Sequence, residues 1–143
     1  MKDRAFELTD TVRETAFQVR RYFGTGHLEK VYENSLAHRL RKLGLKVEQQ
    51  KQLVVRDEDG FVVGEYYADI VIEDLLILEL KAVKTLANEH LAQILGYLRA
   101  TGMEHGVLIN FGAPKFQIRK LSKQDLAPAS GLRSFAQAIC ALF

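Results

Sequence analysis

Apolar positions repeat with helical spacing along the first third of the chain. The stretch LTDTVRETAFQVRRYFG has apolar residues three or four positions apart, at Val12, Ala16, Val19 and Phe23. Thr9 or Asp10 can cap the start of this predicted helix, and Gly24 can end it. The stretch HLEKVYENSLAHRLRKLG repeats the helical pattern and ends at Gly44. Two consecutive helices are therefore predicted.

The pattern changes after Gly44, where β-branched and aromatic residues become frequent and alternate in places with polar ones. The turn sequences DEDG and ED divide this region into three predicted strands, about 45–56, 61–73 and 75–82, in an antiparallel meander. TLANEHLAQILGYLRATG returns to helical spacing and ends at Gly102. HGVLINFG and KFQIRKL predict two further strands, and LRSFAQAICALF predicts a short amphipathic helix.

The order of these elements predicts one α/β domain, with helices flanking a central mixed sheet. We expect the domain to cover 1–121, and 122–143 to form a tail that packs on it or at a dimer interface. No apolar run approaches the roughly 20 residues of a membrane helix, and MKDRAFELTD has no hydrophobic signal core. The single cysteine, Cys140, is typical of a reducing compartment. These features favour a cytoplasmic protein that does not contact a membrane.

Charge gives a weaker indication of partners. The net charge of +2 does not by itself indicate a nucleic-acid-binding protein. Basic residues are clustered at 20–21, 39–42 and 115–123, and each cluster either contacts phosphate or forms a solvated surface. The histidines at 27, 38, 90 and 105 show no metal-ligand spacing.

The stretch LLILELKAV places an acid and a base inside a predicted buried strand. Glu79 and Lys81 are two residues apart and therefore share one face of the strand. A hairpin that turns at Glu73 and Asp74 brings Asp69 opposite Glu79, although a slip of one residue would place Asp69 on the other face. Two explanations make the two carboxylates tolerable: a structural ion-pair cluster with Lys81, or a hard divalent cation between them.

Two predicted helices carry polar side chains that can approach this strand. Gln93 and Tyr97 share a stripe of helix 85–102, and Glu29 and Glu33 share a face of helix 27–44. A third carboxylate from a different element is therefore available. On the alternative interpretation, Glu33 and His90 face solvent, and Tyr32 and Tyr97 lie in the core with satisfied hydroxyls.

The sequence GHLEKVY, at 26–32, resembles the motif that defines the GxxExxY proteins, a family within the PD-(D/E)XK nuclease-like superfamily. GEYYADIVIED, LILELKAV, HLAQILGYLRATG and GVLINFG follow in the same order, so that the resemblance covers roughly 9–121. It implies a restriction-endonuclease-like domain with a nuclease site. One departure is that Ala68 and Asp69 stand where the superfamily's name has Pro-Asp.

The resemblance implies a role for each matching residue. Asp69 and Glu79 would bind Mg²⁺ or Mn²⁺ together with the carbonyl of Leu80, and Glu29 matches a helix acid that some members add to the metal site. Lys81 would position the attacking water or stabilise charge on the phosphate.

Two further residues of the family pattern lie on the helix at 85–102. Gln93 and Tyr97 match a glutamine and its partner one turn later, near the site in related families. The catalytic residues implied are therefore Glu29, Asp69, Glu79, Lys81, Gln93 and Tyr97.

The leading hypothesis is a metal-dependent nuclease that acts on nucleic acid, on DNA more readily than on RNA. The first alternative is a non-catalytic module that keeps the nuclease fold and binds nucleic acid or a partner protein. The second is an assembly protein, in which the C-terminal segment forms a homodimer through an apolar stripe at Leu132, Phe135, Ile139 and Leu142.

Overall fold

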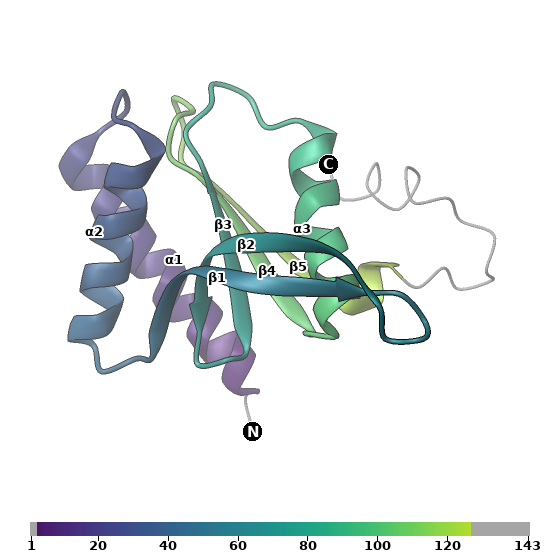
Figure 1. Ribbon diagram of the computed structural model, residues 1–143. Coiled ribbons are helices and arrows are strands. Elements are labelled where there is room, and N and C mark those ends of the chain that lie inside the picture. Colours follow the sequence, from purple (N-terminus) through teal and green to yellow (C-terminus); the bar gives the residue numbers. More distant parts are fainter. Residues whose placement is uncertain (1–2, 127–143) are drawn as a thin grey trace.

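The elements follow the predicted order in the computed structural model, which describes residues 3–126 (Figure 1). They are α1 (Arg4–Phe23), α2 (Glu29–Lys42), β1 (Val47–Arg56), β2 (Val62–Ile72), β3 (Leu76–Lys81), α3 (Asn88–Thr101), β4 (His105–Asn110), β5 (Gln117–Ser122) and the 3₁₀-helix η1 (Lys123–Leu126). None of the helices within 3–126 combines the length and the apolar character needed to cross a bilayer. The helix predicted at 132–143 lies outside the described residues.

The strands form one mixed sheet in the order β1-β2-β3-β4-β5. The pairs β1–β2, β2–β3 and β4–β5 are antiparallel, whereas β3 and β4 are parallel and are connected through α3. The meander and the mixed α/β class are therefore confirmed. Three residues, Glu73, Asp74 and Leu75, connect the last paired residues of β2 and β3, Ile72 and Leu76, and both Glu73 and Asp74 have a φ of 53°.

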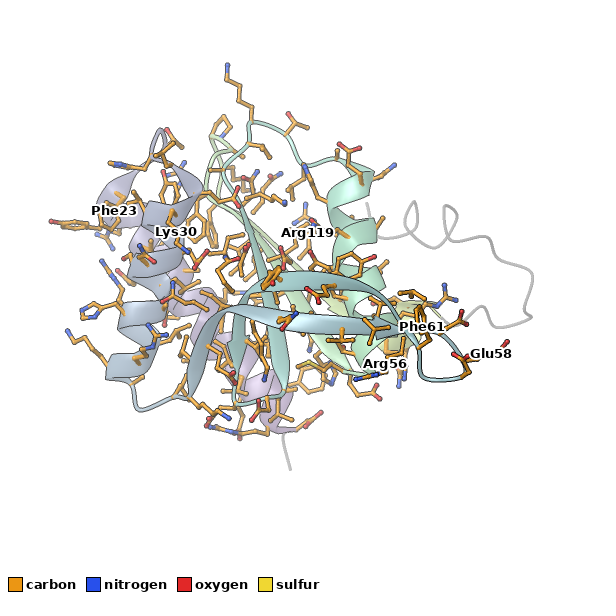
Figure 2. All side chains as sticks on the ribbon, in the orientation of Figure 1. Phe23, Lys30, Arg56, Glu58, Phe61 and Arg119 are labelled. Carbon is orange, nitrogen blue, oxygen red and sulfur yellow. The ribbon has the colours of Figure 1, made fainter. Side chains whose placement is uncertain are left out.

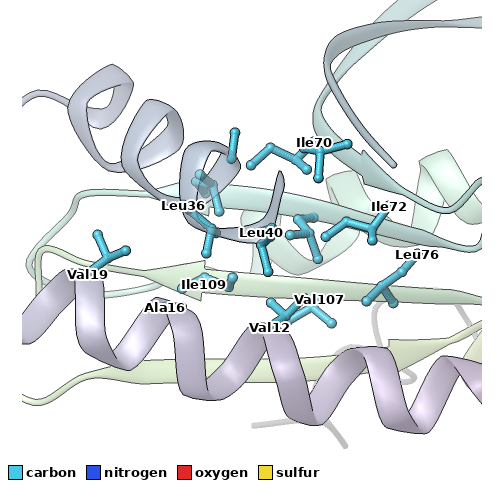
Figure 3. Packing of buried hydrophobic residues seen from close by; sticks show 14 of the residues in the cluster. Val12, Ala16, Val19, Leu36, Leu40, Ile70, Ile72, Leu76, Val107 and Ile109 are labelled. Atoms are coloured by element: carbon cyan, nitrogen blue, oxygen red, sulfur yellow. The ribbon is translucent and has the colours of Figure 1, made fainter. Parts of the chain in front are cut away.

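The sheet has helices on both faces. Helices α1 and α2 cover one face, and Figure 3 shows their side chains against those of the strands. This cluster includes Val12, Val19, Leu36, Leu40, Ile70, Ile72, Leu76, Val107 and Ile109. Helix α3 covers the other face, where Leu91, Ile94 and Leu98 pack against Ile77 and Leu108. Alternate residues of β3 therefore belong to different layers, and Glu79 lies on the face that α3 covers.

The start of α1 differs from the prediction. The helix begins at Arg4, and Asp3 caps it by accepting a hydrogen bond from the Ala5 N–H at 3.4 Å. Thr9 lies inside the helix and its hydroxyl donates to the Ala5 carbonyl at 2.8 Å, so a cap at Thr9 or Asp10 is wrong. Gly24 ends the helix as predicted, at a φ of 70° that favours glycine.

The β1–β2 hairpin bends at Gln50, which has a φ of 50°. Val47 packs in the cluster under α1 and α2, whereas Leu53 packs in the cluster under α3. Residues an even number of positions apart in a strand normally point to the same face of the sheet. Val47 and Leu53 point to opposite faces, so the side-chain alternation of β1 reverses at Gln50. The outer half of the hairpin therefore crosses over the other strands (Figure 1). Figure 2 shows Glu58 and Phe61 at its outer end, far from the α1–α2 layer.

Candidate active site

The site lies where β2 separates from β3. The last directly paired residues of these strands are Ile70 and Leu78. Beyond them, carboxylate oxygens of Asp69 and Glu79 accept hydrogen bonds from backbone N–H groups of the opposite strand. The Leu80 N–H donates to Asp69 Oδ2 at 2.8 Å, and the Asp69 N–H donates to Glu79 Oε1 at 3.2 Å. The predicted register, with Asp69 opposite Glu79, is therefore confirmed. The geometry places both carboxylates at the same gap between the strands.

Glu79 is a carboxylic acid buried beside a second acid, Asp69. Its side chain is buried, with 3% of the residue exposed. Burial and then the negative charge of Asp69 raise the pKa of Glu79 to about 9, although Lys81 acts in the opposite direction. Without a cation beside it, the Glu79 carboxyl therefore holds its proton at neutral pH.

Glu29 reaches the same region from the first turn of α2. The Ala82 N–H, one residue beyond β3, lies near enough to the Glu29 carboxylate to lower its pKa. The carboxyl is partly desolvated, although the residue as a whole is exposed, and this desolvation raises the pKa of Glu29. Lys81 lowers the pKa of Glu29 and Asp69 raises it. The structure thus brings Glu29 into electrostatic contact with the strand residues.

Gln93 and Tyr97 form a pair on α3, as their spacing predicts. The Gln93 side chain donates to the Tyr97 hydroxyl at 2.9 Å, and the Tyr97 ring lies 4.9 Å from that of Tyr66 on β2. Burial and then the charge of Glu79 raise the pKa of Tyr97 to about 12. The hydroxyl therefore keeps its proton at neutral pH and can donate it in a hydrogen bond.

Tyr32 has a structural place. Its ring stacks on Phe111 with centroids 4.7 Å apart, and its hydroxyl donates to the Gly24 carbonyl at 2.7 Å. The hydroxyl also accepts from the His27 N–H at 3.2 Å, so that Tyr32 ties the α1–α2 connection to the core. The interpretation of Tyr32 as a core residue with a satisfied hydroxyl is confirmed.

The alternative interpretation that Glu33 faces solvent is wrong. The residue is buried, with 4% exposed, and it accepts hydrogen bonds from Gln49, Gln50 and Lys30. The sequence contains two signals for this arrangement: Glu33 follows Glu29 by one turn, and two adjacent glutamines lie near the start of a strand. Neither signal indicates which residues are partners.

Asn110 and Gly112 hold the segment that follows Lys81, and neither was singled out in the sequence. The buried Asn110 side chain donates to the Val83 carbonyl at 2.9 Å and accepts from the Val83 N–H at 3.0 Å. Gly112 approaches the same segment so closely that a Cβ there would lie 2.4 Å from the Ala82 carbonyl carbon. The β4–β5 connection therefore fixes the backbone directly after the site.

The order and geometry of these elements agree with a known family. The sequence model of the PD-(D/E)XK nuclease superfamily matches residues 6–121, from α1 into β5. The chain belongs to this superfamily. Comparison with curated proteins finds no match.

Two solved structures show what this superfamily member is similar to. The crystal structure of SSO0001 is 16% identical and aligns with 78% of this chain and 55% of its own, at a TM-score of 0.47. An alkaline exonuclease, LHK-Exo, from Laribacter hongkongensis is 12% identical and aligns with 99% of this chain and 80% of its own, at a TM-score of 0.43. The aligned part thus spans about 55% of the length of SSO0001.

PD-(D/E)XK nucleases generally use divalent metal ions, and the donor set here fits one. Asp69 and Glu79 offer two carboxylates, and the Leu80 carbonyl points to the same side of β3 as the Leu80 N–H that binds Asp69. Mg²⁺ commonly takes only one or two protein carboxylates and fills its remaining positions with water and phosphate. Across the described part of the chain, no three His, Cys, Asp or Glu side chains are grouped to hold an ion. The fit therefore rests on the Asp69–Glu79 pair.

Proposed function

We propose that this chain is a nuclease that hydrolyses phosphodiester bonds with Mg²⁺ or Mn²⁺, on DNA in preference to RNA. The observation that carries the proposal is the Asp69–Glu79 pair at the gap between β2 and β3, with Lys81 two residues further along β3. Asp69, Glu79 and the Leu80 carbonyl would hold the ion. The raised pKa of Glu79 supports this assignment, because a cation would compensate the charge that the protein leaves unbalanced.

Each remaining group acts on the substrate or on the ligands. The ion, when bound, lowers the pKa of its water and polarises a phosphoryl oxygen. Lys81 stabilises the negative charge that develops on the phosphate. Glu29, whose pKa responds to Lys81 and Asp69, would be a further acidic ligand for the ion. Tyr97, kept protonated and oriented by Gln93, donates a hydrogen bond toward the phosphate.

Within the superfamily we assign the chain to the GxxExxY proteins, because the three motif residues have distinct physical roles. Gly26 has a φ of 100°, which an L side chain rarely adopts. Glu29 begins α2 beside the site, and Tyr32 ties the loop between them to the core. A cytoplasmic location and a homodimer remain predictions from the sequence.

The nuclease proposal is tested with the purified chain, single- and double-stranded DNA, RNA, and either Mg²⁺ or Mn²⁺. We expect cleavage with either ion, and we expect Asp69→Asn and Glu79→Gln to lose both ion binding and cleavage. Glu65→Gln is the matched control, because it removes an exposed carboxylate from the same strand as Asp69 and should leave both properties unchanged. Absence of cleavage on all substrates with both ions would contradict the proposal.

A second candidate is a module that binds nucleic acid without hydrolysing it. The lack of a third grouped acid side chain within the described residues favours this alternative. It predicts that Asp69→Asn and Glu79→Gln bind DNA as well as the wild-type chain or better, because repulsion of phosphate is removed. The affinity in both cases should fall steeply with salt. Cleavage by the wild-type chain that these two changes abolish would exclude this alternative.

A further inference from the structure

Asp69 is held by a second contact from a neighbouring strand. While its Oδ2 accepts from the Leu80 N–H, its Oδ1 accepts from the Gln50 side chain at 3.2 Å. The same Gln50 nitrogen donates to Glu33 Oε1 at 2.8 Å. We propose that Gln50 and Glu33 are positioning residues, which fix the orientation of the Asp69 carboxylate for the metal ion. This inference rests on the proposed function, in which Asp69 is a ligand.

Glu33 determines which end of the Gln50 amide faces Asp69. An ionised carboxylate can only accept hydrogen bonds, and Glu33 takes donors from Lys30 at 2.9 Å, Gln49 at 2.7 Å and Gln50 at 2.8 Å. Gln50 must therefore present its NH₂ group, and the second hydrogen of that group reaches Asp69. A rotated amide would direct its carbonyl oxygen at two carboxylates. The buried Glu33 thus selects the amide orientation that supports the ligand.

The backbone at Gln50 is adapted to this contact. Strand pairing is present at Gln49 with Ile70 and at Lys51 with Ala68, but Gln50 itself departs from the ladder with its φ of 50°. A residue other than glycine in this region is uncommon and persists where the surroundings hold it. Gln50 is exposed, so water competes for its bond to Asp69. The anchor on buried Glu33 keeps the amide in place against that competition.

Gln49 provides a matched control for a purely structural role. It donates to Glu33 Oε2 as Gln50 donates to Oε1, but its other contacts are with Asn34 at 2.9 Å and Arg41 at 3.0 Å. Loss of either glutamine therefore removes one donor from Glu33. Only loss of Gln50 removes a contact to Asp69.

The experiment measures Mn²⁺ affinity of the full chain by titration with detection of free Mn²⁺ by electron paramagnetic resonance. We expect Gln50→Leu to weaken Mn²⁺ binding by about tenfold, as is typical when a residue that orients a metal ligand is lost. Gln49→Leu should change the affinity less than about twofold. Gln50→Gly accommodates the positive φ without strain, so it keeps the fold if Gln50→Leu does not, and it should weaken Mn²⁺ binding to the same extent.

The outcomes separate this inference from the proposed function. Wild-type Mn²⁺ affinity in both Gln50 variants would overturn the positioning role while leaving the metal site in place. An equal loss in Gln49→Leu would also overturn it, because both glutamines would then act only through Glu33. A wild-type chain that binds no Mn²⁺ would overturn the proposed metal site and the positioning role together.

Discussion

Glu79 links the chemistry of the site to the stability of the fold. Its ordinary pKa is 4.5, and burial together with the charge of Asp69 raises the pKa to about 9 in the folded chain. Between these two values the folded state binds more protons than the unfolded state. Stability without a metal ion is therefore greatest below the lower value and falls as pH rises through the window. A divalent cation bound in place of the proton would offset this loss of folding stability.

Glu79→Gln should remove this pH dependence. In EDTA we expect the variant to exceed the wild-type chain in free energy of unfolding by about 2 kcal/mol at pH 8, because a neutral amide needs no proton. The difference should shrink toward pH 5. Urea denaturation at several pH values measures it. Equal pH dependence in the two proteins would show that Glu79 is not desolvated as the structure indicates.

Lys81 should matter for turnover more than for ion binding. Lys81→Met should lower the cleavage rate by about 100-fold to 1,000-fold, because stabilisation of transition-state charge is lost. It should also move the pH dependence of Mn²⁺ binding to higher pH, since Lys81 lowers the pKa of both Glu79 and Glu29. Lys84→Met, at an exposed position three residues later, is the control and should change neither. Unchanged cleavage in Lys81→Met would remove Lys81 from the mechanism.

The Asp69–Glu79 pair was predictable from the sequence, whereas the support around it was not. The length of the turn and a side-chain period of two determine which residues face each other in a hairpin, and the three residues 73–75 between Ile72 and Leu76 place Asp69 opposite Glu79. Glu33 meets Gln49 and Gln50 from 16 and 17 residues away, on a strand that exchanges its faces at Gln50. A backbone bend at a residue other than glycine leaves no mark in the hydrophobic pattern, so these partners required coordinates.

At the scale of elements, the β4–β5 connection holds the end of β3. Gly112 leaves no room for a side chain, because a Cβ would lie 2.4 Å from both the Ala82 carbonyl carbon and the Val83 nitrogen. The Ala82 N–H in turn lies near the Glu29 carboxylate at the start of α2 and lowers its pKa. A displaced backbone at this point would therefore affect α2 as well as β3.

Gly112→Ala should consequently destabilise the fold by about 2–3 kcal/mol, within the range for overpacked positions. Gly64→Ala is the control, since a Cβ at Gly64 would meet nothing within 4 Å and its φ is not positive. Thermal and urea unfolding of the two variants measure the difference. Equal stabilities would show that the segment after β3 moves more easily than its packing suggests.

The elements themselves were largely predictable, because long periodic stretches and turn residues define them. The start of α1 was not, since Thr9 and Asp10 are as suitable for capping as Asp3. The burial of Ala5 and Leu8 by the sheet decides among these candidates in favour of the earlier start. The covering of opposite faces by α1–α2 and by α3 likewise depends on tertiary packing.

At the scale of the whole molecule, the basic clusters divide into structural and exposed cations. Arg20 donates to the carbonyls of Phe111 at 3.0 Å, Ala113 at 2.9 Å and Pro114 at 3.3 Å, so it fastens α1 to the β4–β5 connection. Its neighbour Arg21 is exposed. Adjacent arginines of one predicted phosphate-binding cluster therefore have different surroundings.

This division predicts opposite effects of two similar changes. Arg20→Gln should lower the free energy of unfolding by about 2 kcal/mol, because charged donors to three carbonyls, those of Phe111 and Ala113 at buried residues, are lost. Arg21→Gln should leave stability unchanged and weaken DNA binding, with a smaller dependence of affinity on salt. Urea denaturation and fluorescence anisotropy at several salt concentrations test the pair. A destabilised Arg21→Gln, or one with the wild-type salt dependence, would contradict the assignment.

The claim on which the account depends is that a divalent ion binds between β2 and β3. Anomalous diffraction from crystals of the chain soaked in Mn²⁺ tests it most directly. The account predicts an Mn²⁺ peak within bonding distance of the Asp69 and Glu79 carboxylates and of the Leu80 carbonyl oxygen. Crystals in which Mn²⁺ occupies other positions while this gap holds no ion would contradict the metal site and the hydrolytic mechanism built on it.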